Sequence, residues 1–262
     1  MTIARGPEND ISWLKNLTRR GWAWEFLRRL PAYRDAFAQY GAVAADAQRW
    51  GLLRYEEPTL DARGAAIFWR LEDCPSVLPL SALKEVDREE LVPFNLDHIL
   101  CRIEFHHSNS GDRSDILFSE EGRFLQVSIS GARDLKGALL FMPALDIAGN
   151  VTARAASFRR LNDLMQHGHL RQALYPQEPR APRLVKVLKA LDGSLAGLPH
   201  REIAMLIFSK ERVEADWGGQ HHLRDQVRRA IGYGQSLMGG GYRQFLRPTY
   251  SRQIARPGAT RA

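Results

Sequence analysis

Side chains that can hydrogen-bond to nucleic-acid bases gather near the start of a helical segment that ends at about Met238. Four of them lie away from the apolar arc of this segment: Gln220, His221, Arg224 and Arg228. Guanidinium and amide groups pair with base edges in the major groove, and the N-terminal residues of a recognition helix reach those edges. The spacing therefore predicts contacts from these side chains to DNA bases.

Further cations near this segment are expected to contact phosphates: Arg201, Lys210, Arg243 and Arg247. Arg229 lies opposite the apolar arc as well and is also expected to contact DNA. Asp225 does not fit this pattern, because a carboxylate on a DNA-facing surface is repelled by phosphate. It must either accept a hydrogen bond from a cytosine amine or pair with Arg228 or Arg229. We favour the intramolecular pair.

Two helices must position these side chains. The first begins after His200 and turns Ile203, Ala204, Ile207 and Phe208 inward. The second begins near Gln220–His222 and ends before the glycines at 239–241, and it turns inward Leu223, Val227, Ala230, Ile231 and Leu237. The polar connection SKERVEADWGGQ exceeds the roughly three- or four-residue turn of the simplest helix-turn-helix. We therefore expect a helix-turn-helix variant with an inserted turn, in which Trp217 fills the gap.

The positive charge of the chain is concentrated in its last third. Residues 180–262 contain 15 Lys and Arg against 6 Asp and Glu, whereas residues 1–179 contain 22 against 24. Such an asymmetry creates a local positive potential that attracts polyanions and releases their counterions on binding. The alternative interpretation is a solvated basic helix face without a partner.

The N-terminal region predicts a pair of helices between Trp13 and Tyr40. Its apolar residues Trp22, Phe26, Leu30, Tyr33 and Phe37 recur at helical spacing, and the proline at 31 suits the first turn of the second helix. An aromatic stripe of this kind is usually core, and a protein-docking face is the alternative.

The middle of the chain is predicted to form strands and then helices. Runs at 99–105, 116–119, 124–129 and 139–143 are separated by turn-forming loops, which predicts an antiparallel meander. Shorter runs at 50–53, 66–69 and 77–80 suggest strands or an ordered connector, and the acidic stretch 83–91 a surface helix turn or linker. Helical periodicity returns after residue 153, with Phe158, Leu161, Leu164 and Met165 on one stripe, and again over 182–195.

The expected fold class is α+β: an N-terminal helical pair, a small antiparallel sheet and a C-terminal helix-turn-helix variant. The expected domains are residues 1–48 (helical, regulator-like), 49–150 (connector and sheet), 151–248 (helix-turn-helix variant) and a basic tail at 249–262.

Two parts of the chain resemble known families. The motifs REIA at 201–204, LRDQVRR at 223–229 and GGYRQFL at 240–246 resemble the proteobacterial domain of unknown function 2285. The resemblance implies a helix-turn-helix variant associated with integrative and conjugative elements. GWAWEFLRRLPAYRDAF near the N-terminus is similar to the small transcriptional-regulator-like domain of fused activators, except that Leu30 replaces the usual polar residue.

These resemblances imply a DNA-binding activator of genes for excision or transfer of such an element. The alternative is an antiactivator-like module that binds another regulator. Expected partners are double-stranded DNA and RNA polymerase, an antiactivator protein or a second protomer.

Several other classes of protein are disfavoured. The sequence contains no phosphate-binding glycine loop and no serine- or zinc-hydrolase motif, so we expect no enzyme and no cofactor. Its neighbouring histidines lack metal-motif spacing, so we expect no metal site. The only cysteines are Cys74 and Cys101, which we expect to be reduced and buried. No apolar run is long enough to cross a membrane and no signal peptide is recognisable, so a cytoplasmic location is expected.

Overall fold

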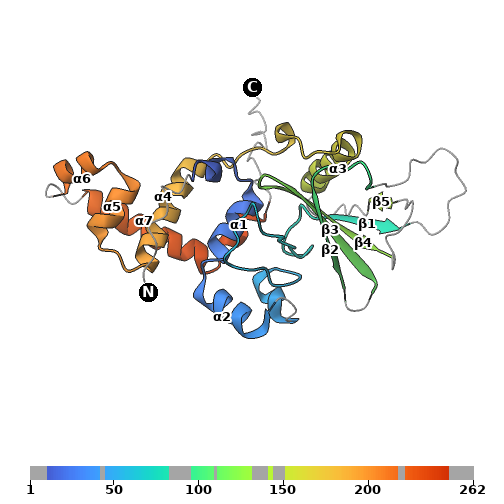
Figure 1. Ribbon diagram of the computed structural model, residues 1–262, viewed down its shortest axis with the longest axis horizontal. Coiled ribbons are helices and arrows are strands. Elements are labelled where there is room, and N and C mark those ends of the chain that lie inside the picture. The colour runs from blue at the N-terminus through green and yellow to red at the C-terminus, as the bar shows by residue number, and fades with distance from the viewer. Residues whose placement is uncertain are drawn as a thin grey trace, which may run out of the picture.

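The computed structural model describes residues 11–41, 45–82, 96–108, 111–131, 141–143, 151–217 and 222–247. Figure 1 shows an elongated molecule with a sheet at one end, the helices α4 to α7 at the other, and the N-terminal helices between them. The expected α+β class is confirmed. Within the described residues, no helix is long and apolar enough to span a membrane.

The N-terminal region forms the expected helical pair. It contains the 3₁₀ helices η1 (Ser12–Asn16) and η3 (Ala45–Trp50) and the α-helices α1 (Arg19–Leu27) and α2 (Pro31–Tyr40). Pro31 occupies the first turn of α2, where its missing N–H has no helical partner to lose. Trp22, Trp24, Phe26 and Tyr33 are completely buried. These rings are therefore core, and the docking-face interpretation is wrong for them.

The sheet has five strands in the order β2-β3-β4-β1-β5. Their bounds are Leu78–Ala82 (β1), Arg102–His107 (β2), Arg113–Glu120 (β3), Arg123–Ser130 (β4) and Phe141–Pro143 (β5). β2, β3 and β4 form the expected antiparallel meander. The turn between β3 and β4 has two residues with positive φ, Glu121 and Gly122, which matches the right-handed twist of a hairpin.

One pairing in the sheet differs from the expectation of a purely antiparallel sheet. β1 lies between β4 and β5, parallel to β4 and antiparallel to β5, so the sheet is mixed. Since a long stretch of chain separates β1 from β4, no tight hairpin constrains their relative direction. Local turn signals cannot reveal such a long-range pairing.

Both faces of the sheet are covered. α3 (Val151–His167) lies beside the sheet in Figure 1 and packs Leu161 and Leu164 against β1 and β4 on one face. Phe158 is 45% exposed, contrary to the stripe expected from the sequence, because Ser157 takes the inward position and donates to the carbonyl of Ser76.

The connector before the sheet covers the other face. The runs at 50–53 and 66–69 meet in a single antiparallel bridge between Leu52 and Trp69. The side chain of Gln126 on β4 accepts from the N–H of Trp69 and donates to its carbonyl, at 3.0 and 2.8 Å. The acidic stretch 83–91 lies outside the described residues.

The C-terminal helices differ from the expected pair in one respect. After the 3₁₀ turn η4 (Gln172–Leu174), α4 (Ala181–Leu195), α5 (His200–Ile207) and α7 (His222–Met238) form close to the expected positions. The polar connection, however, contains a further helix, α6 (Lys210–Asp216). Ser209 caps it by accepting from the N–H of Arg212, and Val213 anchors it in the core. An inserted helix, and not only a longer turn, therefore separates α5 from α7.

Both ends of the described chain contribute to one hydrophobic core. The last helix, η5 (Gly241–Phe245), packs on α1, where Phe245 stacks on Phe26 with the ring centroids 6.0 Å apart. The Tyr242 hydroxyl donates to the carbonyl of Trp50 at 2.9 Å. The N-terminal pair and the C-terminal helices are therefore joined by their interiors.

Candidate nucleic-acid interface

α7 leaves its polar face open to solvent. Leu223, Val227 and Ile231 are buried against neighbouring helices, whereas Arg224, Arg228 and Arg229 are exposed. Since α7 packs on α4 and α5 and not beneath the sheet, its arginines remain accessible. Gln220 and His221, the other expected base contacts, lie outside the described residues.

Asp225, the carboxylate among the arginines of α7, forms the expected pair. Asp225 accepts from the guanidinium of Arg228 at 2.9 Å, and both side chains are exposed, at 44% and 76%. This exposed (i, i+3) pair is weak, because water screens it. Arg228 can therefore exchange Asp225 for a phosphate or a base.

A basic groove runs beside α7. It has a volume of about 230 Å³ and is bounded by α4, α5 and α7. The cations on its walls are Arg183 and Lys186 from α4 and Arg229 from α7. The two residues on α4 were not predicted from the sequence, because only the apolar stripe of that helix indicated its orientation. Their spacing on the opposite face is the signal that could have identified them.

Several of these cations lie over aromatic rings instead of beside carboxylates. The charged groups of Arg183, Lys186 and Arg224 lie 5.4, 5.5 and 5.4 Å from the ring centroids of Tyr233, Phe208 and Trp217. A ring orients a cation without cancelling its charge. Trp217 is half-buried beside the small core of α4, α5 and α7, where it supports Arg224.

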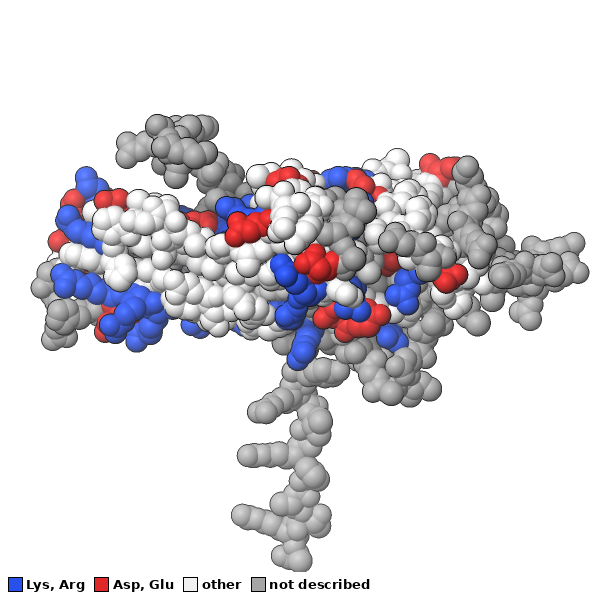
Figure 2. Space-filling model, turned by 90° about the horizontal axis from the view of Figure 1, so that it is seen from below, with Lys and Arg blue, Asp and Glu red and all other residues white. Residues whose placement is uncertain are grey.

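Six cations of α4, α5 and α7 form no ion pair with any described residue: Arg183, Lys186, Lys189, Arg201, Arg224 and Arg229. Figure 2 shows a cluster of blue side chains, with some red ones beside it, at the end of the molecule formed by the C-terminal helices. The open charges give this end a positive potential suited to a polyanion.

The cations of α6, unlike Arg224 and Arg229 on α7, are paired with carboxylates. Lys210 lies 3.8 Å from Glu214, and Arg212 lies 3.8 Å from Asp216. With Glu211 in the first turn, acids outnumber bases on this short helix. Lys210 is exposed, as a phosphate contact requires, but a carboxylate accompanies it.

The structure separates Arg243 and Arg247 from the arginines of α7. The guanidinium of Arg243 donates to the carbonyl of Arg49 and lies over the ring of Tyr242. Arg247 follows η5, and its carbonyl accepts from Arg19. Because α7 rises about 1.5 Å per residue, these residues follow the end of α7 that lies roughly 24 Å from its start.

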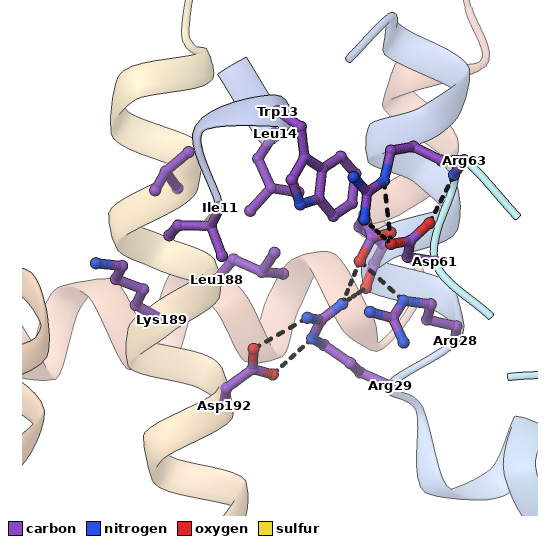
Figure 3. A pocket seen from close by; sticks show the side chains of 12 residues that line it. Ile11, Trp13, Leu14, Arg28, Arg29, Asp61, Arg63, Leu188, Lys189 and Asp192 are labelled. Carbon is purple, nitrogen blue, oxygen red and sulfur yellow. Dashed lines mark hydrogen bonds and ion pairs between the residues drawn. The ribbon is translucent and has the colours of Figure 1, made fainter. Parts of the chain in front are cut away.

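A network of ion pairs fastens the N-terminal helices to the C-terminal ones (Figure 3). Glu25 on α1 is completely buried and accepts from Arg28 and Arg29 at 2.8 and 2.7 Å. Arg29 also forms two hydrogen bonds with Asp192 on α4, at 2.5 and 2.9 Å. Burial alone would lower the pKa of Arg29, but hydrogen bonds and charges from Asp192 and Glu25 outweigh it and raise the pKa.

Two comparisons with protein families identify the two ends of the chain. Residues 142–247 match the family described as "T6SS, Transcription factor, DNA binding domain". Residues 7–53 match the proteobacterial transcriptional regulator-like domain. No curated protein matches the chain. The open basic surface lies within the first match and the aromatic helical pair within the second. The chain therefore carries a transcription-factor DNA-binding domain together with a regulator-like domain, and it is a DNA-binding transcriptional regulator.

Proposed function

We propose that the protein activates transcription by placing the outer face of α7 and the adjoining groove on double-stranded DNA. The observation that carries this proposal is the set of unpaired cations on α4, α5 and α7, within the region that matches a DNA-binding domain. Arg224 and Arg228, with Gln220 and His221, reach base edges. Arg183, Lys186, Arg201 and Arg229 contact phosphates.

We assign DNA reading to α7 rather than α6 because of charge. α6 follows α5 after only Phe208 and Ser209, as the second helix of a compact helix-turn-helix would. Its two cations are accompanied by acids, whereas Arg224 and Arg229 are unpaired among the described residues. Phosphates repel a surface in which acids outnumber bases.

The biological role rests on the resemblance to fused activators of integrative and conjugative elements. We infer that the target genes serve excision or transfer of such an element and that the regulator-like domain contacts RNA polymerase, an antiactivator or a second protomer. A regulator of chromosomal DNA in bacteria works in the cytoplasm. The T6SS description of the matched DNA-binding family offers T6SS genes as the other possible target.

The DNA interface is tested by measuring DNA affinity at several salt concentrations. The full chain first selects a binding site from random duplexes, and fluorescence anisotropy then gives its Kd. If about five to eight phosphates are neutralised, the logarithm of affinity falls with the logarithm of salt with a slope of about −4 to −7.

Paired variants then decide between the two helices. The double variant Arg224→Ala with Arg228→Ala should lose specific binding by at least roughly thirtyfold, because each base contact contributes about 1–3 kcal/mol. Lys210→Ala with Arg212→Ala should retain most of the specificity. The opposite result would assign DNA reading to α6 and refute our assignment.

A reporter assay and a chromatin-immunoprecipitation map test the biological role. An activator raises expression from its own site in a heterologous host. A chain that only represses a reporter driven by another activator would be an antiactivator. The map shows whether bound sites lie beside transfer genes or T6SS genes.

A further inference from the structure

A second cationic site lies outside the proposed DNA interface, at the meeting point of α1, α3 and the end of η5. The structure forms there a partly open cavity of about 360 Å³. Arg19 and Arg20 come from α1, Arg160 from α3, and Tyr175 from the segment before α4. The volume suits a small ligand.

Two of the polar side chains in this cavity are buried without a complete set of partners. Arg20 is 8% exposed, and although its Nε donates to Ser76 Oγ at 2.9 Å, its Nη1 has no hydrogen-bond partner among the described residues. Tyr175 is 3% exposed, and in the same described part of the chain its hydroxyl has no partner either. Buried polar groups in native proteins are nearly always satisfied, so each exception requires an explanation.

The cavity also holds positive charge that the described residues do not neutralise. Arg160 donates to the carbonyl of Leu174 at 2.9 Å and stacks over Tyr175, 4.7 Å from the ring centroid. Neither Arg20 nor Arg160 forms an ion pair within the described part of the chain. Burial lowers the pKa of Arg160, and the charge of Arg20 lowers it further. Two uncompensated guanidinium groups at one cavity are unfavourable unless an anion joins them.

Most of the remaining wall is apolar, which limits the chemistry of the ligand. The apolar residues include Phe124, Ala153, Ala156, Pro176 and Leu246, and the polar ones include Thr18, Thr152 and Arg247. We propose that this cavity binds a small organic anion, a carboxylate or phosphate monoester with an apolar body. Arg20 and Arg160 bind the anionic group, the Tyr175 hydroxyl donates to it, and the apolar walls contact the body.

The position of the site gives such a ligand access to both functional parts of the chain. Its walls come from the helical pair that matches the regulator-like domain and from the helices that match the DNA-binding domain. The occupied site would therefore stabilise the joint between them.

The test compares anionic and neutral probes of similar shape by thermal unfolding and titration calorimetry in a chloride buffer. Benzoate and phenyl phosphate represent the two anion types, and benzamide is the neutral control. At least one anion should raise the unfolding temperature of the full chain by roughly 3 °C or more at saturation. Benzamide should not. An equal shift with benzamide, or no shift with either anion at tens of millimolar, would overturn the proposal.

Variants of the cavity arginines test whether the anion-induced rise in unfolding temperature comes from binding in this cavity. Arg160→Gln should abolish the anion-induced shift, whereas Arg159→Gln, an exposed neighbour on the same helix, should preserve it. Arg20→Gln should act like Arg160→Gln. If Arg20→Gln fails to fold, Arg160→Gln alone decides, because Arg160 is only half-buried. A shift that survives in Arg160→Gln refutes the site.

The proposed anion site and the proposed DNA interface can be refuted independently of each other. The α7 double variant Arg224→Ala with Arg228→Ala should keep the full anion-induced shift. If that variant loses the shift, the anions bind the basic surface of α7 and the cavity proposal is wrong. Loss of DNA binding in the same variant tests only the proposed function.

Discussion

Arginines serve two opposite purposes at the two sides of α4. On the side facing α1, Arg29 is fixed between the carboxylates of Glu25 and Asp192. On the side facing α7, Arg183 and Lys186 lie over aromatic rings, and none of the described carboxylates is paired with them. The first arrangement holds helices together, and the second leaves charge available to a partner.

The difference shows that the position of the acids, more than that of the bases, marks a binding surface. Cations occur over much of the chain, but carboxylates accompany Arg28 and Arg29 at the joint between α1 and α4. A ring in place of an acid orients the cation while preserving its field. The two kinds of surface should respond differently to mutation, salt and pH.

The largest loss of stability is expected from removing Glu25, the buried acid at the joint between α1 and α4. Glu25→Ala leaves Arg28 and Arg29 without their shared carboxylate and the N–H of Ala62 without its acceptor. The free energy of unfolding should fall by about 3–5 kcal/mol, as when one partner of a buried pair is lost. Urea denaturation measures it. Asp225→Ala, at an exposed pair, should change stability by less than about 1 kcal/mol. Equal losses would show that the two surfaces do not differ.

The stability that Glu178, a second buried acid, contributes should depend on pH. Burial alone would raise the pKa of Glu178, but hydrogen bonds and charge from Arg180, and the charge of Arg19, outweigh it and lower the pKa. A lowered pKa contributes stability above the unfolded value of about 4.3, and this stability is lost as the pH falls through the folded pKa.

Glu178→Gln should therefore cost about 1–3 kcal/mol at neutral pH, and the difference from the wild type should shrink as the pH falls below about 4.3. Unfolding curves over this range test the expectation. Glu214→Gln on α6 is the exposed control and should show no such convergence. A cost of Glu178→Gln that does not change with pH would mean that packing, not charge, explains it.

A smaller effect on DNA binding should separate the two faces of α4. Lys186 lies at the groove, whereas Lys189 on the same helix lines the joint with α1 (Figure 3). Lys186→Gln should weaken DNA binding about fivefold to tenfold at 0.1 M salt and reduce the salt slope by about 0.9. Lys189→Gln should leave the slope unchanged. Equal slopes for both variants would exclude the groove from the interface.

The smallest expected effect is an increase in DNA affinity. Asp225→Asn removes a negative charge from the outer face of α7 and releases Arg228. DNA affinity should rise about twofold to fivefold, since an exposed pair of this kind contributes at most about 1 kcal/mol. Anisotropy titrations at constant salt measure the gain. A loss of affinity would instead mean that Asp225 itself contacts a base.

Local patterns predicted much of this fold, because they depend on neighbours in the sequence. The apolar stripe of α7, Pro31 at the start of α2 and the turn before Arg123 all act over a few residues, and all formed as expected. The pairing of Asp225 was also predictable, since a helix brings residues three apart together.

Features that depend on distant contacts were not predictable. The parallel pairing of β1 with β4 joins residues about fifty positions apart. α6 was missed because a seven-residue helix with one buried valine has little apolar periodicity. The cavity beside Arg20 and the unpaired state of Lys186 depend on which carboxylates the fold brings near. Periodicity alone does not specify that.

The shared interior has a consequence for how the protein is made. Phe26 on α1 stacks on Phe245 in η5, so the core of the first helices stays unfinished until the segment containing Phe245 has left the ribosome. A product interrupted before η5 would expose apolar rings of α1 and become a target for proteases and chaperones. Only a chain synthesised through η5 would thus acquire the rigid scaffold that α7 needs, and incomplete copies could not compete for the operator.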